Sequence, residues 1–181
     1  MKVGFIGLGI MGAPMAGHLQ KAGHELYLHD LAPSLPAVLL EGGAVACDSG
    51  QAVTEQAEVV ILMVPDTPDV EAALFGPHGV AEGLRPGQLV IDMSSISPTA
   101  TTAFAARIND LDCLYVDAPV SGGSIGAQNA TLTIMAGGPQ DAFDRAQPLF
   151  AVMGGTVTLI GTRNGDGQVC KAANQIIVGV T

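Results

Sequence analysis

Residues 2–12 read KVGFIGLGIMG, an apolar run that leads straight into a G-x-G-x-x-G spacing. The spacing alone is weak evidence, but between a strand and a helix each glycine has a role. The first allows a tight turn, the second lets the backbone approach a pyrophosphate, and the third lets the helix pack on the strand. Free N–H groups and the helix dipole then favour an anion at the helix N-terminus. The stretch predicts a dinucleotide-binding turn, with a purely structural turn as the alternative; its residues are Gly7, Leu8, Gly9, Ile10, Met11 and Gly12.

The strand-then-helix order repeats along the chain. Short β-branched runs alternate with helical patterns, several of which have a proline in the first turn, where its fixed φ is favourable. Such alternation predicts βαβ units, and therefore an α/β fold with a Rossmann-type, doubly wound, mostly parallel sheet. The predicted strands are 2–6, 25–30, 58–64, 88–92, 114–118, 132–136 and 156–160, and the predicted helices are 11–21, 33–41, 67–74, 98–108 and 139–153.

The composition fits this fold and excludes several classes of function. Hydrophobic residues make up 48% of the 181 residues, as expected where parallel strands are covered on both faces. No apolar run reaches the roughly 18 residues of a membrane span, and the chain enters a strand at once, which argues against a secretory signal. A net charge of -10 would repel nucleic acid. Cys47, Cys113 and Cys170 fit neither a disulfide framework nor a zinc site, so we expect a cytoplasmic protein without a metal.

The second predicted strand ends in Asp30, eighteen residues after Gly12. A carboxylate at this place can accept hydrogen bonds from the adenosine ribose hydroxyls of a dinucleotide. The same carboxylate would repel a 2′-phosphate, and Leu31 rather than an arginine follows it. The sequence therefore favours NAD over NADP as the cofactor. A solvated turn residue is the alternative interpretation of Asp30.

Two later strand ends are candidates for further cofactor contacts, because ligands of open α/β sheets bind beyond the carboxyl ends of the strands. Val64, Pro65 and Asp66 follow one predicted strand, and Ser94 and Ser95 follow the next. Their backbone groups and hydroxyls are suited to line the ribose and the nicotinamide. Each segment is equally consistent with an ordinary turn and a helix N-cap.

The segment after residue 118 contains Ser121, Gly122 and Gly123. A hydroxyl beside approachable backbone N–H groups suits a carboxylate or another oxyanion. Lys171 lies in an apolar helical segment with Asn174 three residues later, so both side chains project from one helix face. A lysine among apolar neighbours has a depressed pKa and can exchange a proton with a substrate oxygen. From the residues alone, a glycine-rich loop and a lysine that extends to solvent are equally compatible.

Taken in order, these segments resemble the β-hydroxyacid dehydrogenase family along the whole chain. The resemblance rests on residues 7–16, 117–123 and 167–175. It implies an NAD(P)-dependent oxidoreductase that transfers hydride between the nicotinamide and a short 3-hydroxy or 3-oxo acid. It further implies that Ser121, Gly122 and Gly123 hold the substrate carboxylate, that Lys171 is the catalytic acid/base and that Asn174 orients the substrate.

Several substrates remain compatible with this family. Residues 92–98 and 171–177 are most similar to tartronate semialdehyde (2-hydroxy-3-oxopropionate) reductases, which form glycerate, and 3-hydroxyisobutyrate dehydrogenases are the nearest alternative. A phosphogluconate-type decarboxylating dehydrogenase ranks last, because no basic cluster offers a phosphate clamp. An NAD-binding module without catalysis is the alternative from another class.

The resemblance also predicts how the chain is divided. Residues 1–164 are expected to form the NAD(P)-binding domain, and residues 165–181 to begin a helix that leads into an all-helical second domain. Because the sequence stops within that helix, we expect a truncated enzyme that is slow or inactive alone, since nothing excludes water from its site. The apolar residues 175–180 predict association into a homo-oligomer.

Overall fold

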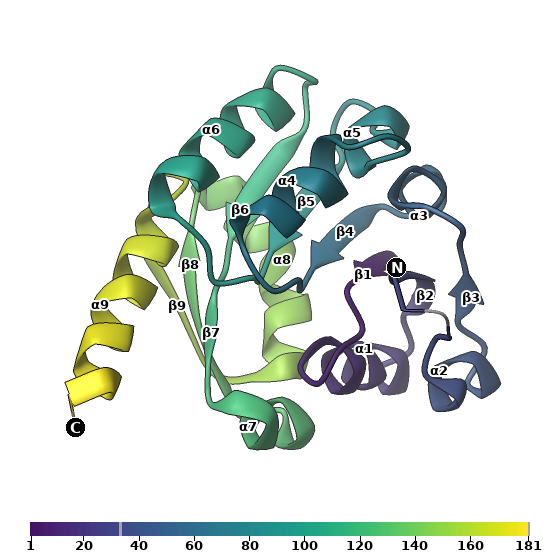
Figure 1. Cartoon of the computed structure of the whole chain (residues 1–181), viewed down its shortest axis with the longest axis horizontal. Coiled ribbons are helices and arrows are strands. Elements are labelled where there is room, and N and C mark those ends of the chain that lie inside the picture. The colour runs from purple at the N-terminus through teal and green to yellow at the C-terminus, as the bar shows by residue number, and fades with distance from the viewer. Residues whose placement is uncertain (33, 181) are drawn as a thin grey trace.

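The computed structural model describes residues 1–32 and 34–180, which form a nine-stranded sheet with helices on both faces (Figure 1). The strands are β1 (Lys2–Ile6), β2 (Glu25–His29), β3 (Val45–Ala46), β4 (Val59–Leu62), β5 (Leu89–Asp92), β6 (Leu114–Asp117), β7 (Val120–Ser121), β8 (Leu132–Gly137) and β9 (Gly154–Gly161). The helices are α1 (Gly12–Lys21), α2 (Ala37–Glu41), α3 (Gly50–Gln56), α4 (Thr67–Phe75), α5 (Val80–Gly83), α6 (Pro98–Asn109), α7 (Gly123–Asn129), α8 (Gln140–Met153) and α9 (Asp166–Val180).

The sheet has a parallel part and a reversed part. Its strand order is β3-β2-β1-β4-β5-β6-β8-β7, with β9 paired to β8. All neighbours from β3 to β6 are parallel, whereas β8 is antiparallel to both β6 and β7 and parallel to β9. The only residue pair between β6 and β8 in the described chain is Asp117 with Gly137. Beyond it, β7 and β8 extend past the carboxyl edge of β1 to β6.

The parallel strands are apolar on both sides because helices cover both faces. In β4, Val59 and Ile61 pack in a core with residues of α1, α2 and α8. Val60 and Leu62 alternate with them and pack in a second core with residues of α3, α4, α5 and α6. All four side chains are at most 2% exposed. This burial on two faces accounts for the high hydrophobic content, and the predicted doubly wound, mostly parallel sheet is confirmed.

Every predicted strand and helix is present, with ends shifted by a few residues. The missed elements are short: β3 and β7 have two residues, α5 has four, and α3 and α7 have seven, which is too little for a periodic signal. The predicted helix 33–41 begins only at Ala37. A residue that precedes a proline disfavours helical backbone, and Pro36 itself has a non-helical ψ of 117. Pro33 lies outside the described residues.

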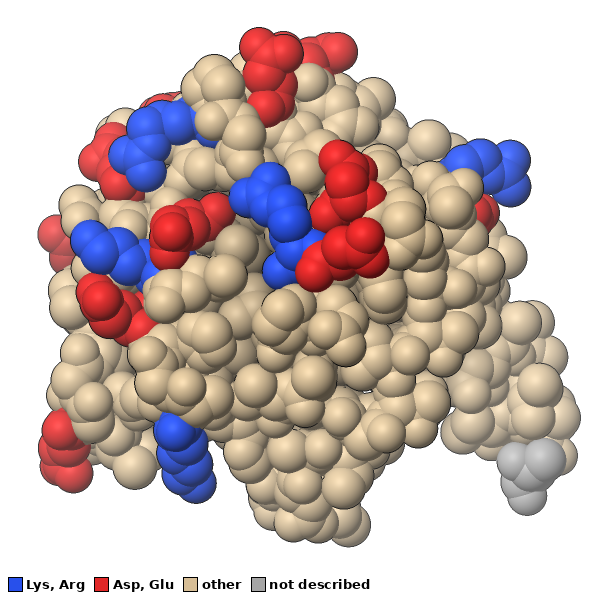
Figure 2. All heavy atoms as spheres, turned by 180° about the vertical axis from the view of Figure 1, so that it is seen from behind, with Lys and Arg blue, Asp and Glu red and all other residues tan. Residues whose placement is uncertain are grey.

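Helix α9 runs along β8 and β9 and carries the C-terminus away from the sheet (Figure 1). It starts at Asp166, within the segment 165–181 that is predicted to begin a helix. Ile176 and Val180 are 70% and 80% exposed, and Figure 2 shows few charged side chains on the lower part of the face where α7 and α9 lie. Within residues 1–32 and 34–180, no helix combines the length and apolarity needed to cross a bilayer. The division at residue 164 and the second domain remain predictions.

Candidate active site

The glycine-rich turn leaves room at one position and none at two others. Gly7 has φ +92, and a Cβ there would lie 2.2 Å from the Met63 carbonyl oxygen. A Cβ on Gly12 would lie 1.9 Å from the Gly7 carbonyl oxygen. In contrast, a Cβ on Gly9 would meet no protein atom within 4 Å. No side chain caps α1 and its first turn has no acidic residue, so the turn fits the pyrophosphate of a dinucleotide.

Asp30 holds the glycine-rich turn against the end of β2. One carboxylate oxygen accepts a hydrogen bond from the Leu8 N–H at 2.5 Å, and the other accepts one from the Ala32 N–H at 2.7 Å. These contacts give Asp30 a structural role in the turn, and its contact with a ribose remains a prediction. Each oxygen keeps a second lone pair for a ribose hydroxyl. Leu31, which follows Asp30, and Ile10 of the glycine-rich turn are 94% and 76% exposed.

The two later strand ends have mainly structural contacts. Asp66 is the N-cap of α4 and forms a capping box with Asp69. Ser94 is completely buried, and its hydroxyl accepts a hydrogen bond from the Val64 N–H at 3.0 Å. The Ser94 hydroxyl is therefore buried beneath the surface. The prediction that this hydroxyl lines the cofactor site is wrong, because it is used to hold the Val64 N–H. Pro65 and Ser95 are exposed beyond the strand ends.

A cavity of about 400 Å³ joins the glycine-rich turn to the segments predicted to hold the substrate. Ligands of parallel sheets bind at the carboxyl ends of the strands, which is where this cavity lies. A second cavity, of about 450 Å³, lies at the amino ends, between Met1, Glu58 and Arg85, away from these segments. The first cavity is lined by Met11, Met63, Ser95, Val120, Ser121, Gly122, Gly123, Lys171, Gln175 and Val178.

Lys171 is the charged residue in the wall of the first cavity. Its side chain is 8% exposed, which excludes the alternative of a lysine that extends to solvent. The Nζ atom donates a hydrogen bond to Gln175 Oε1 at 2.7 Å. Burial lowers the pKa of the Lys171 ammonium, because the charged form loses solvation. Lys171 thus has the environment of a proton donor to a bound oxygen.

Gln175, rather than the predicted Asn174, reaches the cavity. Asn174 is half-buried and outside the lining of the cavity, and its amide donates to Gln175 Oε1 at 3.2 Å. Gln175 lines the cavity and contacts Lys171 directly. Sequence reasoning missed Gln175, although its spacing of four residues from Lys171 predicts the same helix face.

Ser121, Gly122 and Gly123 line the same cavity as Lys171. Gly122 and Gly123 have φ +128 and +58 and lead into α7. A Cβ on Gly123 would meet no protein atom within 4 Å, so its backbone is approachable. Helix α7 is tied to α1, because His18 Nε2 donates to the carbonyl oxygens of Ala127 and Gln128, both at 3.0 Å. The helix that follows the glycine-rich turn is therefore in direct contact with the helix that follows Ser121–Gly123.

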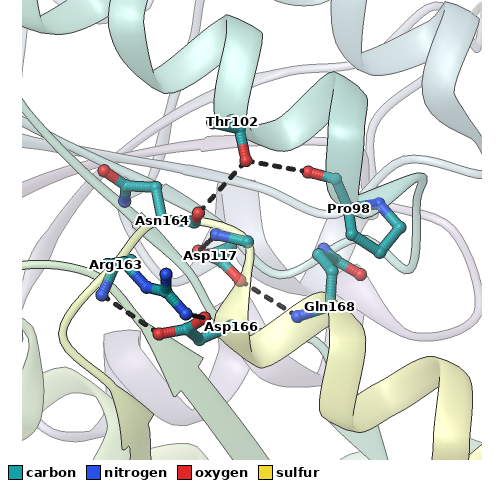
Figure 3. Close-up of polar contacts among 8 residues, drawn as sticks. Pro98, Thr102, Asp117, Arg163, Asn164, Asp166 and Gln168 are labelled. Carbon is teal, nitrogen blue, oxygen red and sulfur yellow. Dashed lines mark hydrogen bonds and ion pairs between the residues drawn. The ribbon is translucent and has the colours of Figure 1, made fainter.

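Behind the cavity lies a buried polar cluster of Asp92, Tyr115 and Asp117. The Tyr115 hydroxyl donates to Asp92 Oδ2 at 3.0 Å, and the Ser94 N–H donates to Asp92 Oδ1 at 2.9 Å. Burial raises the pKa of both carboxyls to about 6, and it raises the pKa of Tyr115 well above its usual value. Figure 3 shows Asp117 facing the first turn of α9. Across residues 1–32 and 34–180, no group of three His, Cys, Asp or Glu side chains is placed to hold a metal ion.

The known proteins that this chain is similar to are dehydrogenases and reductases. Residues 2–161 match the family described as the NAD binding domain of 6-phosphogluconate dehydrogenase. The chain is 51% identical over 180 residues to 2-hydroxy-3-oxopropionate reductase of Escherichia coli (strain K12), covering 99% of this chain and 61% of that protein. Among solved structures, Mycobacterium tuberculosis 3-hydroxyisobutyrate dehydrogenase with L-serine has a TM-score of 0.92 and 36% identity, over 99% of this chain and 60% of the other.

A third relative bears on the cofactor. The structure of Psf3 in complex with NADP+ and 2-OPP has a TM-score of 0.91 and 29% identity, over 97% of this chain and 62% of the other. The chain therefore spans about 60% of the length of these relatives.

Proposed function

Because this chain belongs to the family of NAD binding domains of 6-phosphogluconate dehydrogenase, we propose that its protein is a nicotinamide-dependent reductase of short 3-oxo acids. Membership confirms the resemblance to dinucleotide-dependent hydroxyacid dehydrogenases. The observation that carries the proposal is the cavity in which Met11 of the glycine-rich turn, Ser121–Gly123 and the buried Lys171 meet. Reduction of an oxo acid needs a cofactor that supplies hydride, a proton donor, and groups that hold the substrate carboxylate in place.

Tartronate semialdehyde is the proposed substrate, and glycerate the product. NADH, when bound, supplies the hydride for the aldehyde carbon. The Ser121 hydroxyl and the amides of Gly122 and Gly123 hold the substrate carboxylate. Lys171 donates a proton to the aldehyde oxygen as that carbon becomes an alcohol, which balances the reaction. This substrate is favoured by the 51% identity to 2-hydroxy-3-oxopropionate reductase.

Asn174 keeps its proposed role in orienting the hydroxyl end of the substrate, acting through its hydrogen bond to Gln175. Gln175 is a further candidate for substrate contact, since it lines the cavity and accepts from Lys171. The proposed cofactor contacts are Gly7, Leu8, Gly9, Ile10, Met11 and Gly12 in the turn, Asp30 at the ribose, and Val64, Pro65, Asp66, Ser94 and Ser95, partly through their backbone.

NAD is the proposed cofactor rather than NADP. A 2′-phosphate would lie beside the Asp30 carboxylate and the exposed Leu31, with repulsion from the first and no hydrogen bond from the second. A cytoplasmic location is proposed from three free cysteines. Association through the exposed apolar residues of α9 is proposed from Ile176 and Val180.

Kinetics on the full-length product of the gene test the function. We expect NADH oxidation with tartronate semialdehyde to have a higher kcat/KM than with 2-methyl-3-oxopropanoate, the oxidised form of 3-hydroxyisobutyrate. NADPH should be the poorer cofactor. A preference for the methyl compound would establish the 3-hydroxyisobutyrate alternative. NADH binding without turnover of any short oxo acid would favour the non-catalytic module.

A further inference from the structure

The first turn of α9 is fastened to the sheet by Asp117 (Figure 3). Its two carboxylate oxygens accept hydrogen bonds from the N–H groups of Gly165 and Gln168, at 2.7 and 3.0 Å. The contact is close: a Cβ on Gly167 would lie 2.4 Å from the Met135 carbonyl oxygen, and one on Gly137 would lie 2.5 Å from the Gly167 nitrogen. The base of α9 therefore has little freedom to shift over β6 and β8.

The side chain of Gln168 links the same turn to the loop that follows β5. It is 1% exposed. Its amide nitrogen donates to the Ser94 carbonyl oxygen at 2.7 Å, and its amide oxygen accepts from the Ile96 N–H at 3.1 Å. Ser95, which lines the cavity, lies between these two residues. The Ser94 hydroxyl in turn accepts from the Val64 N–H, so the link continues to the end of β4.

Gln168 and Lys171 lie three residues apart on the buried face of α9, whereas Val169 between them is 57% exposed. Side chains with this spacing are neighbours on a helix. A helical turn moves as a unit, so a displacement of the Gln168 turn also displaces the lysine. The buried amide of Gln168 thus fixes the position of Lys171 relative to the loops after β4 and β5, where the nicotinamide is proposed to bind.

We propose that Gln168 and Asp117 are positioning residues that set the place of Lys171 relative to the cofactor loops. The proposal rests on the proposed function for its kinetic consequence, but the position of the lysine is measurable without turnover. Neither side chain lines the cavity, so each acts through α9. Misplacement of a catalytic group by about 1 Å can cost roughly 10²-fold in rate.

The test compares two glutamines that are alike except in location. Gln168→Met keeps the size of the side chain and removes both hydrogen bonds to the β5 loop. Gln88→Met is the matched control. Gln88 is 7% exposed, its amide nitrogen donates to the Thr54 and Ala57 carbonyl oxygens, and its amide oxygen accepts from the Arg85 N–H. Both variants lose buried hydrogen bonds, but only the first lies next to Lys171.

Two readouts separate positioning from general damage. In the full-length protein, we expect Gln168→Met to lower kcat about tenfold or more, with a smaller change in NADH affinity. We expect Gln88→Met to lose as much thermal stability as Gln168→Met but to keep kcat and NADH affinity near wild type. In the 181-residue chain, ¹³C-dimethylation labels Lys2, Lys21, Lys171 and the N-terminal amine, and the signal that is lost in Lys171→Arg is that of Lys171. We expect the NMR titration to give Lys171 a higher pKa in Gln168→Met than in wild type and in Gln88→Met.

Equal effects of both variants on kcat and on the Lys171 titration would overturn the proposal. If Gln168→Met does not fold, Asp117→Asn takes its place, because an amide group leaves one of the two N–H donors of α9 without an acceptor. A wild-type protein that reduces no oxo acid would defeat the proposed function only. The titration would still decide whether Gln168 positions the lysine.

Discussion

Two helices of this chain begin at a G-x-G step. Helix α1 follows Gly7-Leu8-Gly9, and α9 starts within Gly165-Asp166-Gly167. The first glycines have nearly the same backbone, with φ +92 and +97. Their surroundings differ: no side chain caps α1, whereas two N–H groups at the start of α9 donate to the buried Asp117.

The difference shows how one local pattern serves two purposes. A helix N-terminus attracts negative charge in either case. Where the protein supplies a carboxylate from its own sheet, the junction becomes a structural joint. Where it leaves the end open, the same junction is available to the phosphates of a ligand. We therefore propose that the N-terminus of α1 binds a ligand, whereas the start of α9 serves to hold Lys171 in place.

The strongest test of that assignment is Lys171→Ala in the full-length protein. We expect kcat to fall by roughly 10²- to 10⁴-fold, because the proton donor is lost, while NADH affinity stays near wild type. Stopped-flow reduction kinetics and calorimetry measure the two quantities. An unchanged kcat would remove α9 from the chemistry.

The carboxylate at α9 should make stability depend on pH. Asp117 and Asp92 have pKa values raised to about 6 in the folded chain, against roughly 3.9 when unfolded. Between these values the folded state binds more protons, so stability falls as pH rises from about 4 to 6, by at most ~1.4 kcal/mol per pH unit for each group. The contribution levels off only above about pH 7, where both carboxyls are ionised in the folded chain as well.

Asp117→Asn removes one of these groups. Urea unfolding at pH 5 and pH 7 should therefore show a larger cost of the substitution at pH 5, where the wild type gains from protonation. A cost that is larger at pH 7 would mean that the ionised carboxylate, through its hydrogen bonds to α9, is the favoured form.

Alanine at the second glycine of each step separates the two junctions. Gly167→Ala places a methyl group 2.4 Å from the Met135 carbonyl oxygen, and we expect a loss of about 1–3 kcal/mol in unfolding free energy. NADH affinity should remain close to wild type. Chemical denaturation and calorimetry on one preparation provide both values, and an undiminished stability would contradict the tight joint.

Gly9→Ala should show the opposite behaviour. Its methyl group meets no protein atom within 4 Å, so the unfolding free energy should change little. The methyl occupies the approach of the pyrophosphate, and NADH affinity should fall about tenfold, roughly 1.4 kcal/mol. Equal affinity for Gly9→Ala and wild type would place the dinucleotide elsewhere.

The sequence predicts the fold well because its evidence is local. Apolar runs mark the long strands, and prolines mark the start of several helices. The glycines of the G-x-G-x-x-G spacing, Gly7, Gly9 and Gly12, lie within six consecutive residues. Strands of two residues leave no periodic pattern, which is why β3 and β7 are missed. Asn174 and Gln175 lie three and four residues after Lys171, and both spacings place a side chain on the same helix face. Only the orientation of α9 in the folded chain shows that Gln175 is the one that lines the cavity.

The contacts that place the lysine are non-local and could not be predicted. Gln168 bonds Ser94 across 74 residues of sequence, and Asp117 bonds Gly165 across 48. A glutamine and an aspartate in these positions have many possible partners in the sequence. The burial of Ser94 is likewise a property of packed layers, which the strand pattern around it does not reveal.

The reversal of β8 and β9 has a consequence for how this fold diversifies. The wall on the dinucleotide side comes from residues before Asp117, and the opposite wall comes from residues after it. Substitutions of cavity-lining side chains in one stretch can leave the other in place, provided that the contacts of His18 and Gln168 between the two stretches are kept. Evolution or protein engineering can thus change which acid substrate is bound while the dinucleotide-binding turn stays the same.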